Sequence, residues 1–229
     1  MRMFNLSALL LCIGLLSGCI GDDIIMDTVE ENLRISASID TLGVGDTYQF
    51  EAIYTNNVGQ EESTNIDWSS SDENLLRIDA QGLATGIAQG SVSVTANVNL
   101  ADKTVTDVFD LHIADNTVVA APQNRNGALR TTSSYVLQGN FVLRPDGDDL
   151  VLSFDDSYRA SSSLPGLYLY LTNNPQTTSG AYEIGKATSF SGSHTYTIPG
   201  GDATLEQYTH VLFFCKPFNV KVGDGAFEE

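Results

Sequence analysis

The feature that most constrains the fold is a strict alternation of apolar and polar residues, while helical periodicity is hard to find anywhere in the chain. Every second residue is apolar in segments 47–54 and 91–98. Successive side chains of a β-strand point to opposite faces, so each segment is expected to be a strand with one buried face. The predicted buried residues are Tyr48, Phe50, Ala52, Tyr54, Val92, Val94, Ala96 and Val98. The pattern predicts an all-β protein whose first domain is a β-sandwich.

The second half of the chain is equally rich in predicted strands. Two alternating runs, 135–143 and 150–154, flank the turn-forming residues 145–147, which indicates a hairpin. Segment 211–215 is apolar at every position, as is usual for a strand covered on both faces. This half is therefore expected to form an antiparallel β-sandwich or a barrel-like domain.

The chain divides into two globular segments and two connecting segments. Residues 33–114 and 127–229 carry the strand patterns and are each long enough to bury a core. Residues 19–32 are acidic and aperiodic, so they are expected to be a solvated tether. Residues 115–126 contain a proline and several turn-forming asparagines, and are expected to be a linker. Residues 1–18 belong to none of these segments.

The N-terminus has the layout of an export signal. Arg2 is followed by the apolar run 6–16, which is too short to span a bilayer as a stable helix. The run ends in Leu16-Ser17-Gly18-Cys19, which resembles the lipobox of bacterial lipoproteins. The resemblance implies that residues 1–18 are a signal peptide, removed when Cys19 receives a lipid. The alternative is a simple secretory signal in which Cys19 is incidental.

The residues that follow Cys19 indicate the membrane to which the protein is sent. Position 20 is Ile20 rather than the aspartate that is usual for retention in an inner membrane, so an outer-membrane location is expected. Asp22 and Asp23 resemble the short acidic signal that exports lipoproteins of the Bacteroidota to the cell surface. The sequence therefore predicts a lipid-anchored outer-membrane protein with exposure at the cell surface.

The net charge argues against nucleic acid and anionic membrane surfaces as partners. Lys and Arg number 11 against 29 Asp and Glu, a net charge of −18. Such a chain repels nucleic acid and anionic membrane surfaces. No second apolar run reaches membrane-spanning length, so the N-terminal lipid is the expected membrane contact.

The cysteine count restricts the chemistry of the exported protein. Of three cysteines, Cys12 lies in the predicted signal peptide and Cys19 is the predicted site of lipid attachment. Cys215 is then the only thiol, which excludes an internal disulfide and a zinc site built on cysteine pairs.

The first globular segment resembles the bacterial Ig-like domain of group 2. The family's successive blocks are matched, in order, by residues 42–47, 67–72, 78–86 and 90–96. The resemblance implies that Trp68 lies in the sandwich core and Gly82 in a turn. Members of this family occur as repeats in adhesins and as single spacers in surface proteins. One copy beside a membrane tether favours the spacer role.

The second globular segment resembles the DM-13 domain, a small extracellular β domain. The matching blocks are residues 127–129 with 135–139, then 164–171, 192–199 and 211–220. The resemblance puts the family's signature cysteine at Cys215 and implies a redox or electron-transfer role for it. Two departures occur, because Pro165-Gly166 stands where the family commonly has Pro-Asp, and Phe214 where a tryptophan is frequent. A function that needs that acidic residue would be lost here.

Local chemistry favours an inert thiol over the redox role. A reactive cysteine needs a nearby cation, metal or helix N-terminus, and burial opposes thiolate formation. Cys215 follows four apolar residues, and Lys216 would point to the opposite face of the strand. The histidines and aspartates show no spacing typical of a haem, iron–sulfur or calcium site, so no cofactor and no metal are expected. What stays open is a mixed disulfide or sulfenic acid formed with another molecule.

No catalytic signature is present, so the protein is not expected to be an enzyme. The sequence predicts an Ig-like spacer that displays a DM-13-like module for adhesion or ligand binding, with an unknown protein or glycan as partner. The alternative is a redox role through Cys215. Five tyrosines are candidates for a sugar-stacking surface, although tyrosine is equally common on ordinary sheets. They are Tyr158, Tyr168, Tyr170, Tyr182 and Tyr196.

Overall fold

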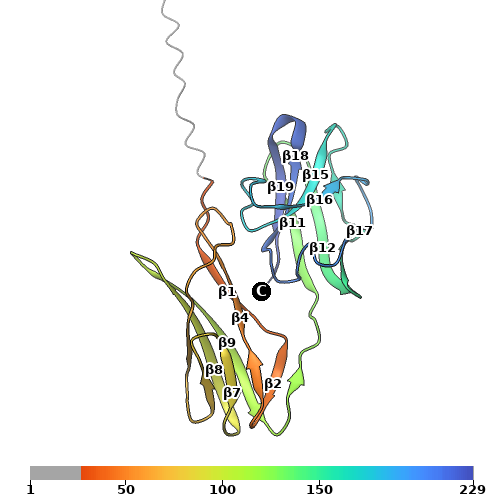
Figure 1. Cartoon of the computed structure of the whole chain (residues 1–229). Coiled ribbons are helices and arrows are strands. Elements are labelled where there is room, and N and C mark those ends of the chain that lie inside the picture. The colour runs from red at the N-terminus through yellow and green to blue at the C-terminus, as the bar shows by residue number, and fades with distance from the viewer. Residues whose placement is uncertain (1–26, 229) are drawn as a thin grey trace, which may run out of the picture.

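The computed structural model describes residues 27–228 and confirms the all-β prediction (Figure 1). Cys12, Cys19 and the predicted signal peptide lie outside the described residues. The strands of the first domain are β1 (Asn32–Ser36), β2 (Ile39–Gly43), β3 (Thr47–Gln49), β4 (Glu51–Thr55), β5 (Asp67–Ser70), β6 (Leu76–Ile78), β7 (Leu83–Gly86), β8 (Gly90–Asn99) and β9 (Thr104–Ala114).

These strands form three small sheets around one core. The largest has the order β10-β2-β9-β8-β5, in which β10 is Val118–Val119; a second has the order β3-β7-β6, and β1 pairs with β4. β2 runs parallel to β9, with Thr41 opposite His112, whereas the other pairings described in this domain are antiparallel. The predicted face of β8 is confirmed, because Val92, Val94, Ala96 and Val98 are all buried.

The predicted strand 47–54 is divided at Phe50. β3 pairs with β7 and β4 pairs with β1, so the chain passes from one sheet to another at this residue. The backbone N–H of Phe50 donates to the carbonyl of Gly82 at 2.9 Å, and the Phe50 ring is buried. The alternation of apolar and polar residues nevertheless continues across this division, because Phe50 and Tyr54 both face the core.

Trp68 and Gly82 meet at the margin of this core. Trp68 is partly buried and lies 6.2 Å from the ring of Phe50, so it borders the core rather than occupying its centre. Gly82 has a φ of +82° in the turn between β6 and β7, as expected. A Cβ on Gly82 would lie 2.7 Å from the Phe50 carbonyl and 3.1 Å from the Trp68 ring, so only glycine fits there.

The second domain is one antiparallel, barrel-like sheet. Its strand order is β16-β15-β18-β19-β11-β12-β13-β17, and β14 pairs with β12. The two edges approach each other where the Tyr196 hydroxyl accepts a hydrogen bond from the Thr188 N–H, at 3.0 Å. The elements are β11 (Arg125–Thr131), β12 (Leu137–Asp146), β13 (Asp149–Phe154), β14 (Arg159–Ala160), β15 (Leu167–Thr172), β16 (Tyr182–Lys186), β17 (His194–Ile198), β18 (His210–Cys215), the 3₁₀ turn η1 (Lys216–Phe218) and β19 (Val220–Ala226).

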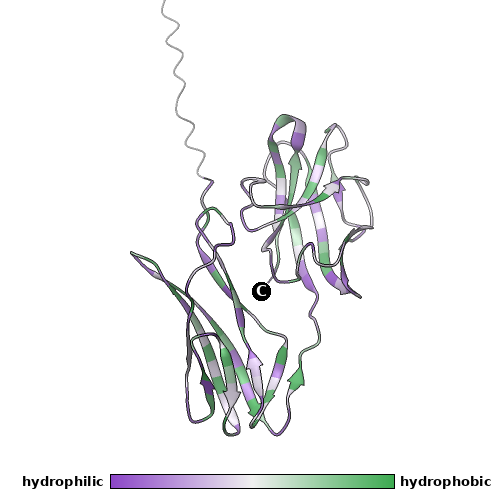
Figure 2. Cartoon of the chain, viewed as in Figure 1, coloured by the Kyte–Doolittle hydropathy of each residue, from purple (hydrophilic) through white to green (hydrophobic). Residues whose placement is uncertain are grey.

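β18 is central in this sheet, as its apolar sequence predicts. It pairs with β15 on one side and β19 on the other. Its inner face packs in the main core of the domain, and its outer face joins a small separate cluster around Leu212 and Phe214. The alternation of apolar and polar residues along the strands is visible in Figure 2.

Part of the expected linker is in strands. Val118–Val119 forms β10 against β2, and the hydroxyl of Thr117 accepts a hydrogen bond from the Gly43 N–H at 2.9 Å. Arg125 begins β11 and is 8% exposed. Polar residues order here because free strand edges and carbonyls of both domains supply hydrogen-bond partners.

The chain enters the first domain next to the second domain. In Figure 1 the first described residues lie at the end of the first domain that faces the barrel-like sheet, and the chain then runs to the far end and back through β10. Contact is direct, because the Asn174 side chain donates a hydrogen bond to the carbonyl of Asp27. The second domain therefore lies beside the entry point, although the first domain separates the two in sequence.

Candidate functional site

Cys215 lies deep inside the second domain. Its exposed fraction is 0%, and its backbone lies opposite Leu167 on β15 and Val220 on β19. It belongs to the main apolar cluster, together with Phe213 and Leu169. Among the described residues it is the free cysteine, and it is buried.

Lys216 turns away from the thiol. Its ammonium donates a hydrogen bond to the Glu183 carboxylate at 2.7 Å and lies 4.9 Å from the centre of the Tyr168 ring, on the outer face of the sheet. The hydrogen bond from Lys216 holds the pKa of Glu183 below its ordinary value, and the same contact raises the pKa of Lys216. Lys216, the cation adjacent to Cys215 in sequence, is thus ion-paired on the other face of the sheet, and the surroundings of the thiol are apolar.

The three histidines lie in separate surroundings. His112 is exposed on β9 beside Ser91, and His194 stacks on the ring of Phe154 at 4.9 Å. Burial lowers the pKa of His210, which lies at the start of β18. Within residues 27–228, no group of three or more His, Cys, Asp or Glu side chains is arranged to hold a metal ion.

The five candidate tyrosines do not form one surface. Tyr158 is fully buried in the core, and Tyr170 is 4% exposed on the opposite face of the sheet. Burial raises the pKa of both phenols well above the ordinary value. Tyr182 donates a hydrogen bond to Asp202 at 3.0 Å, and Tyr168 lies under Lys216. Tyr158 and Tyr170 therefore have structural roles in this fold.

Asp224 is a fully buried carboxylate on β19. Arg130 contacts it at 2.7 Å across the sheet, and Lys221 forms a second ion pair with it. Burial by itself raises the pKa of Asp224, but the two cations outweigh burial and hold the pKa below its ordinary value. These residues join β11 to β19 and close one side of the barrel-like sheet.

The two domains are joined by a polar interface centred on Asn174, which is 0% exposed. Its amide donates to the carbonyls of Asp27 and Val58, the latter at 3.1 Å, and its oxygen accepts from the Gln176 N–H at 3.0 Å. A Cβ on Gly59 would lie 2.7 Å from the Asn174 Cβ, so the backbones approach closely. Every hydrogen-bonding atom of this buried amide faces a partner.

A second set of contacts also joins the two domains. Glu206 of the second domain accepts ion pairs from Arg34 of β1 at 3.8 Å and from Arg125 at 3.4 Å. Arg125 also donates to the carbonyl of Tyr208 at 2.6 Å and stacks over the Phe227 ring at 4.4 Å. One carboxylate is thus shared between a residue of each domain.

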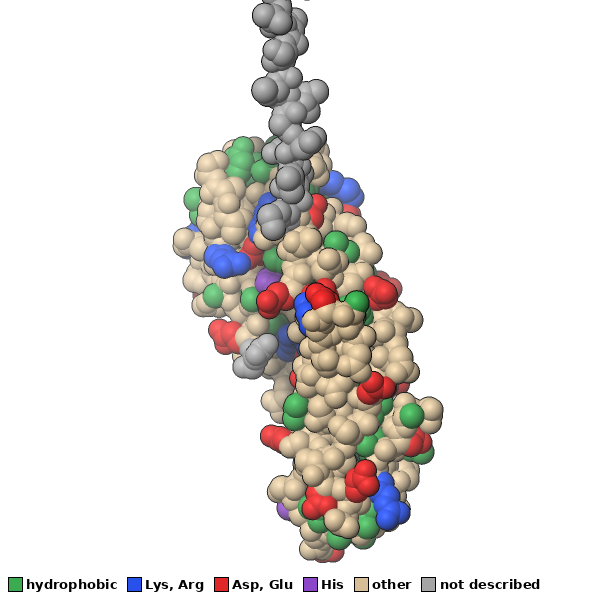
Figure 3. Space-filling model, turned by 90° about the vertical axis from the view of Figure 1, so that its left-hand side faces the viewer, with side chains coloured by type: hydrophobic (Ala, Val, Ile, Leu, Met, Phe, Trp, Pro, Cys, Tyr) green, Lys and Arg blue, Asp and Glu red, His purple; other side chains and the backbone are tan. Residues whose placement is uncertain are grey.

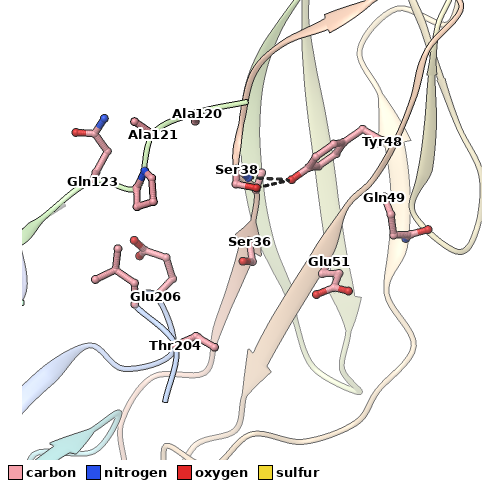
Figure 4. Close-up of a pocket in the computed structure, with 13 residues that line it drawn as sticks. Ser36, Ser38, Tyr48, Gln49, Glu51, Ala120, Ala121, Gln123, Thr204 and Glu206 are labelled. Atoms are coloured by element: carbon pink, nitrogen blue, oxygen red, sulfur yellow. Dashed lines mark hydrogen bonds between the residues drawn. The ribbon is translucent and has the colours of Figure 1, made fainter. Parts of the chain in front are cut away.

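Beside Glu206 the domains enclose an open cavity of about 440 Å³, called the junction cleft here (Figure 4). The first domain contributes residues before β2 and around β3 and β4, and the second contributes the loop 204–206. The residues that line it are Ser36, Ala37, Ser38, Tyr48, Gln49, Glu51, Ala120, Ala121, Pro122, Gln123, Thr204, Leu205 and Glu206.

Sequence reasoning missed these interface residues. Asn174, Glu206 and Arg125 are polar residues in loops or at strand ends, where such residues are ordinarily solvated. No periodicity distinguishes them, because their partners lie up to 172 residues away in the chain. Acidic side chains are scattered over the visible face instead of forming one patch (Figure 3).

No helix in the described part of the chain is long and apolar enough to cross a membrane.

Comparisons with known proteins agree with this architecture. Residues 31–108 match the family model described as bacterial Ig-like domain (group 2), and residues 130–227 match the one described as Electron transfer DM13. A relative named Ice-binding protein 1, from Shewanella frigidimarina (strain NCIMB 400), is 26% identical over 142 residues. That match covers 61% of this chain but only 16% of the relative. The chain therefore contains a group 2 bacterial Ig-like domain followed by a DM13 domain.

Proposed function

We propose that this protein is a non-enzymatic, lipid-anchored protein of the outer membrane, in which the Ig-like and DM13 domains form one rigid binding unit at the cell surface. The observation that carries the proposal is the interface between the domains. A flexible spacer would need only a solvated linker, whereas here a buried amide and a shared carboxylate connect the domains. Ice binding is not part of this proposal, because the match covers only 16% of the ice-binding relative.

The position of the tether refines the spacer hypothesis. Asp27 is bonded to the DM13 domain, and Cys19 lies only eight positions earlier in the sequence. Eight residues span at most about 30 Å when fully extended. A lipid on Cys19 would therefore keep the DM13 domain near the membrane, with the far end of the Ig-like domain projecting outward.

Replacing Asn174 by alanine should uncouple the domains. The change removes three hydrogen bonds and leaves the Val58 and Asp27 carbonyls without their donor, at a cost of about 1–3 kcal/mol for each buried unsatisfied group. We expect the radius of gyration from small-angle scattering to rise and unfolding to separate into two transitions.

The matched control is Asn126→Ala, which removes an exposed amide from β11. It should leave both the scattering profile and the single transition unchanged. An Asn174→Ala variant with the wild-type radius of gyration and one cooperative transition would contradict the rigid-unit proposal.

The redox alternative makes an opposite prediction about Cys215. A thiol with an exposed fraction of 0% should react with a thiol reagent only after denaturation, and should do so at least a hundredfold faster in denaturant than in the native protein. The measurement is a thiol titration of purified residues 20–229 in buffer and in guanidinium, together with an absorbance spectrum.

Two outcomes would favour the redox role instead. One is stoichiometric reaction of the native thiol, and the other is a visible absorption band from a bound cofactor. As a check on the assay, a variant with an exposed cysteine, such as Ser134→Cys, should react at once without denaturant, since Ser134 is exposed.

A further inference from the structure

We infer that the junction cleft is a binding site for a neutral saccharide, formed jointly by the two domains. This inference rests on the proposed binding function and names its ligand class. The cleft volume of about 440 Å³ falls within the range of roughly 300–1,000 Å³ that is usual for small-molecule sites.

The cleft has two polar walls from different domains. Figure 4 shows Ser36, Tyr48 and Glu51 on the side of the Ig-like domain, and Thr204 and Glu206 on the side of the DM13 domain. The side chains of Ser36, Glu51 and Thr204 make no hydrogen bond or ion pair with another described residue. Their donors and acceptors are therefore available to a ligand.

Tyr48 supplies a fixed aromatic ring in this cleft. Its hydroxyl accepts a hydrogen bond from the Ser38 N–H at 2.8 Å, and its ring meets that of Phe50 edge-on at 4.9 Å. An aromatic ring held in place beside hydroxyl and carboxylate groups matches the two kinds of surface on a sugar, which has apolar C–H groups and a rim of hydroxyls.

The polar groups of the cleft select against anionic and purely apolar ligands. Both Arg34 and Arg125 are bound to Glu206, while Glu51 has no cationic partner among the described residues. An anionic ligand would meet the Glu51 carboxylate and the overall charge of −18. A purely apolar ligand would leave the hydroxyls and carboxylates of both walls without partners. A neutral, hydroxyl-rich ligand satisfies them.

The interface contacts explain how the cleft keeps its shape without a ligand. Glu206 forms part of the cleft wall and is also the carboxylate shared by the two arginines. Asn174 provides a separate hydrogen-bonded contact between the domains. Walls held in this way lose little freedom when a ligand binds, which favours affinity.

The test begins with an array of neutral oligomers of glucose, galactose, mannose and N-acetylglucosamine beside sialylated and sulfated glycans. Purified residues 20–229 should bind members of the neutral group. For a bound glycan, calorimetry should show about a tenfold loss of affinity for Glu51→Gln, and about a threefold loss for Thr204→Val. Glu73→Gln makes the same chemical change on an exposed residue outside the cleft and should bind like wild type.

Three results would overturn the inference. They are failure of every neutral glycan to bind, preference for the acidic glycans, and binding that Glu51→Gln and Thr204→Val leave unchanged although both variants fold. Binding that the cleft variants do not alter would locate the ligand elsewhere and leave the proposed binding function standing. The proposed binding function is tested by different measurements: the reactivity of the native Cys215 thiol, the absorbance spectrum and the behaviour of the Asn174→Ala variant.

Discussion

Cys19→Ala, expressed behind a signal peptide that is cleaved without lipid attachment, should transfer nearly all of the protein from the membrane fraction to the soluble fraction. Cys19 lies outside the described residues, and the prediction rests on the lipobox-like sequence Leu16-Ser17-Gly18-Cys19. A diacylglyceryl group and an amide-linked chain together anchor a protein stably, whereas one chain gives only marginal binding. Loss of the thiol removes all of these chains, so the change is expected to be nearly all-or-none.

Cys12→Ala is the matched control for this experiment, since it removes a cysteine from the predicted signal peptide without touching the modified position. It should stay in the membrane fraction. Mass spectrometry of the wild-type N-terminus should detect the acyl chains on Cys19. If Cys19→Ala sedimented with membranes like the wild type, the anchor would have been misidentified.

Asp224→Asn should destabilise the DM13 domain by about 3 kcal/mol. Breaking a buried ion pair leaves uncompensated charge, and the cost lies at the low end of the usual range because the Arg130 side chain is 67% exposed and can be rehydrated. Urea unfolding should show this as a lower midpoint with an unchanged slope. Asp148→Asn, at the exposed tip of the β12–β13 hairpin, is the control and should have a negligible effect.

The same residue predicts how stability depends on pH. The two cations lower the pKa of Asp224 in the folded protein, and its unfolded value is about 4. The charged carboxylate therefore stabilises the fold fully above about pH 4, and this contribution is lost as the pH falls through the lowered folded pKa. The stability gap between wild type and Asp224→Asn should narrow in acid. A gap of constant size across that range would show that the ionised form is not the stabilising one.

Much of the local structure could be predicted from alternation alone. In β8 the pattern identifies which side chains are buried, because the period of a strand is two and one residue of shift would reverse its faces. The division of segment 47–54 into β3 and β4 at Phe50 could not be predicted. The alternation of apolar and polar residues runs through both strands without interruption, so nothing in the pattern indicates the break. It depends on Gly82, whose carbonyl binds the Phe50 N–H from 32 positions further along the chain.

The burial of Cys215 shows how far sequence reasoning extends to chemistry. Four apolar residues before it predict a covered strand, and the structure gives the thiol an exposed fraction of 0%. The ion pair of Lys216 with Glu183 adds the reason that no cation reaches the thiol. A redox role would need an opening of the core that the packing around β18 opposes.

The sequence by itself determined the β class of this protein and the order of its two domains, because alternation and turn-forming residues are local signals. Only the tertiary structure decided how the domains meet. Asn174, Glu206 and the walls of the junction cleft acquire their roles from partners distant in sequence, and a polar loop residue looks the same whether it faces water or a second domain. Hydrogen bonds act over about 3 Å in space, whereas sequence patterns report only on neighbours along the chain.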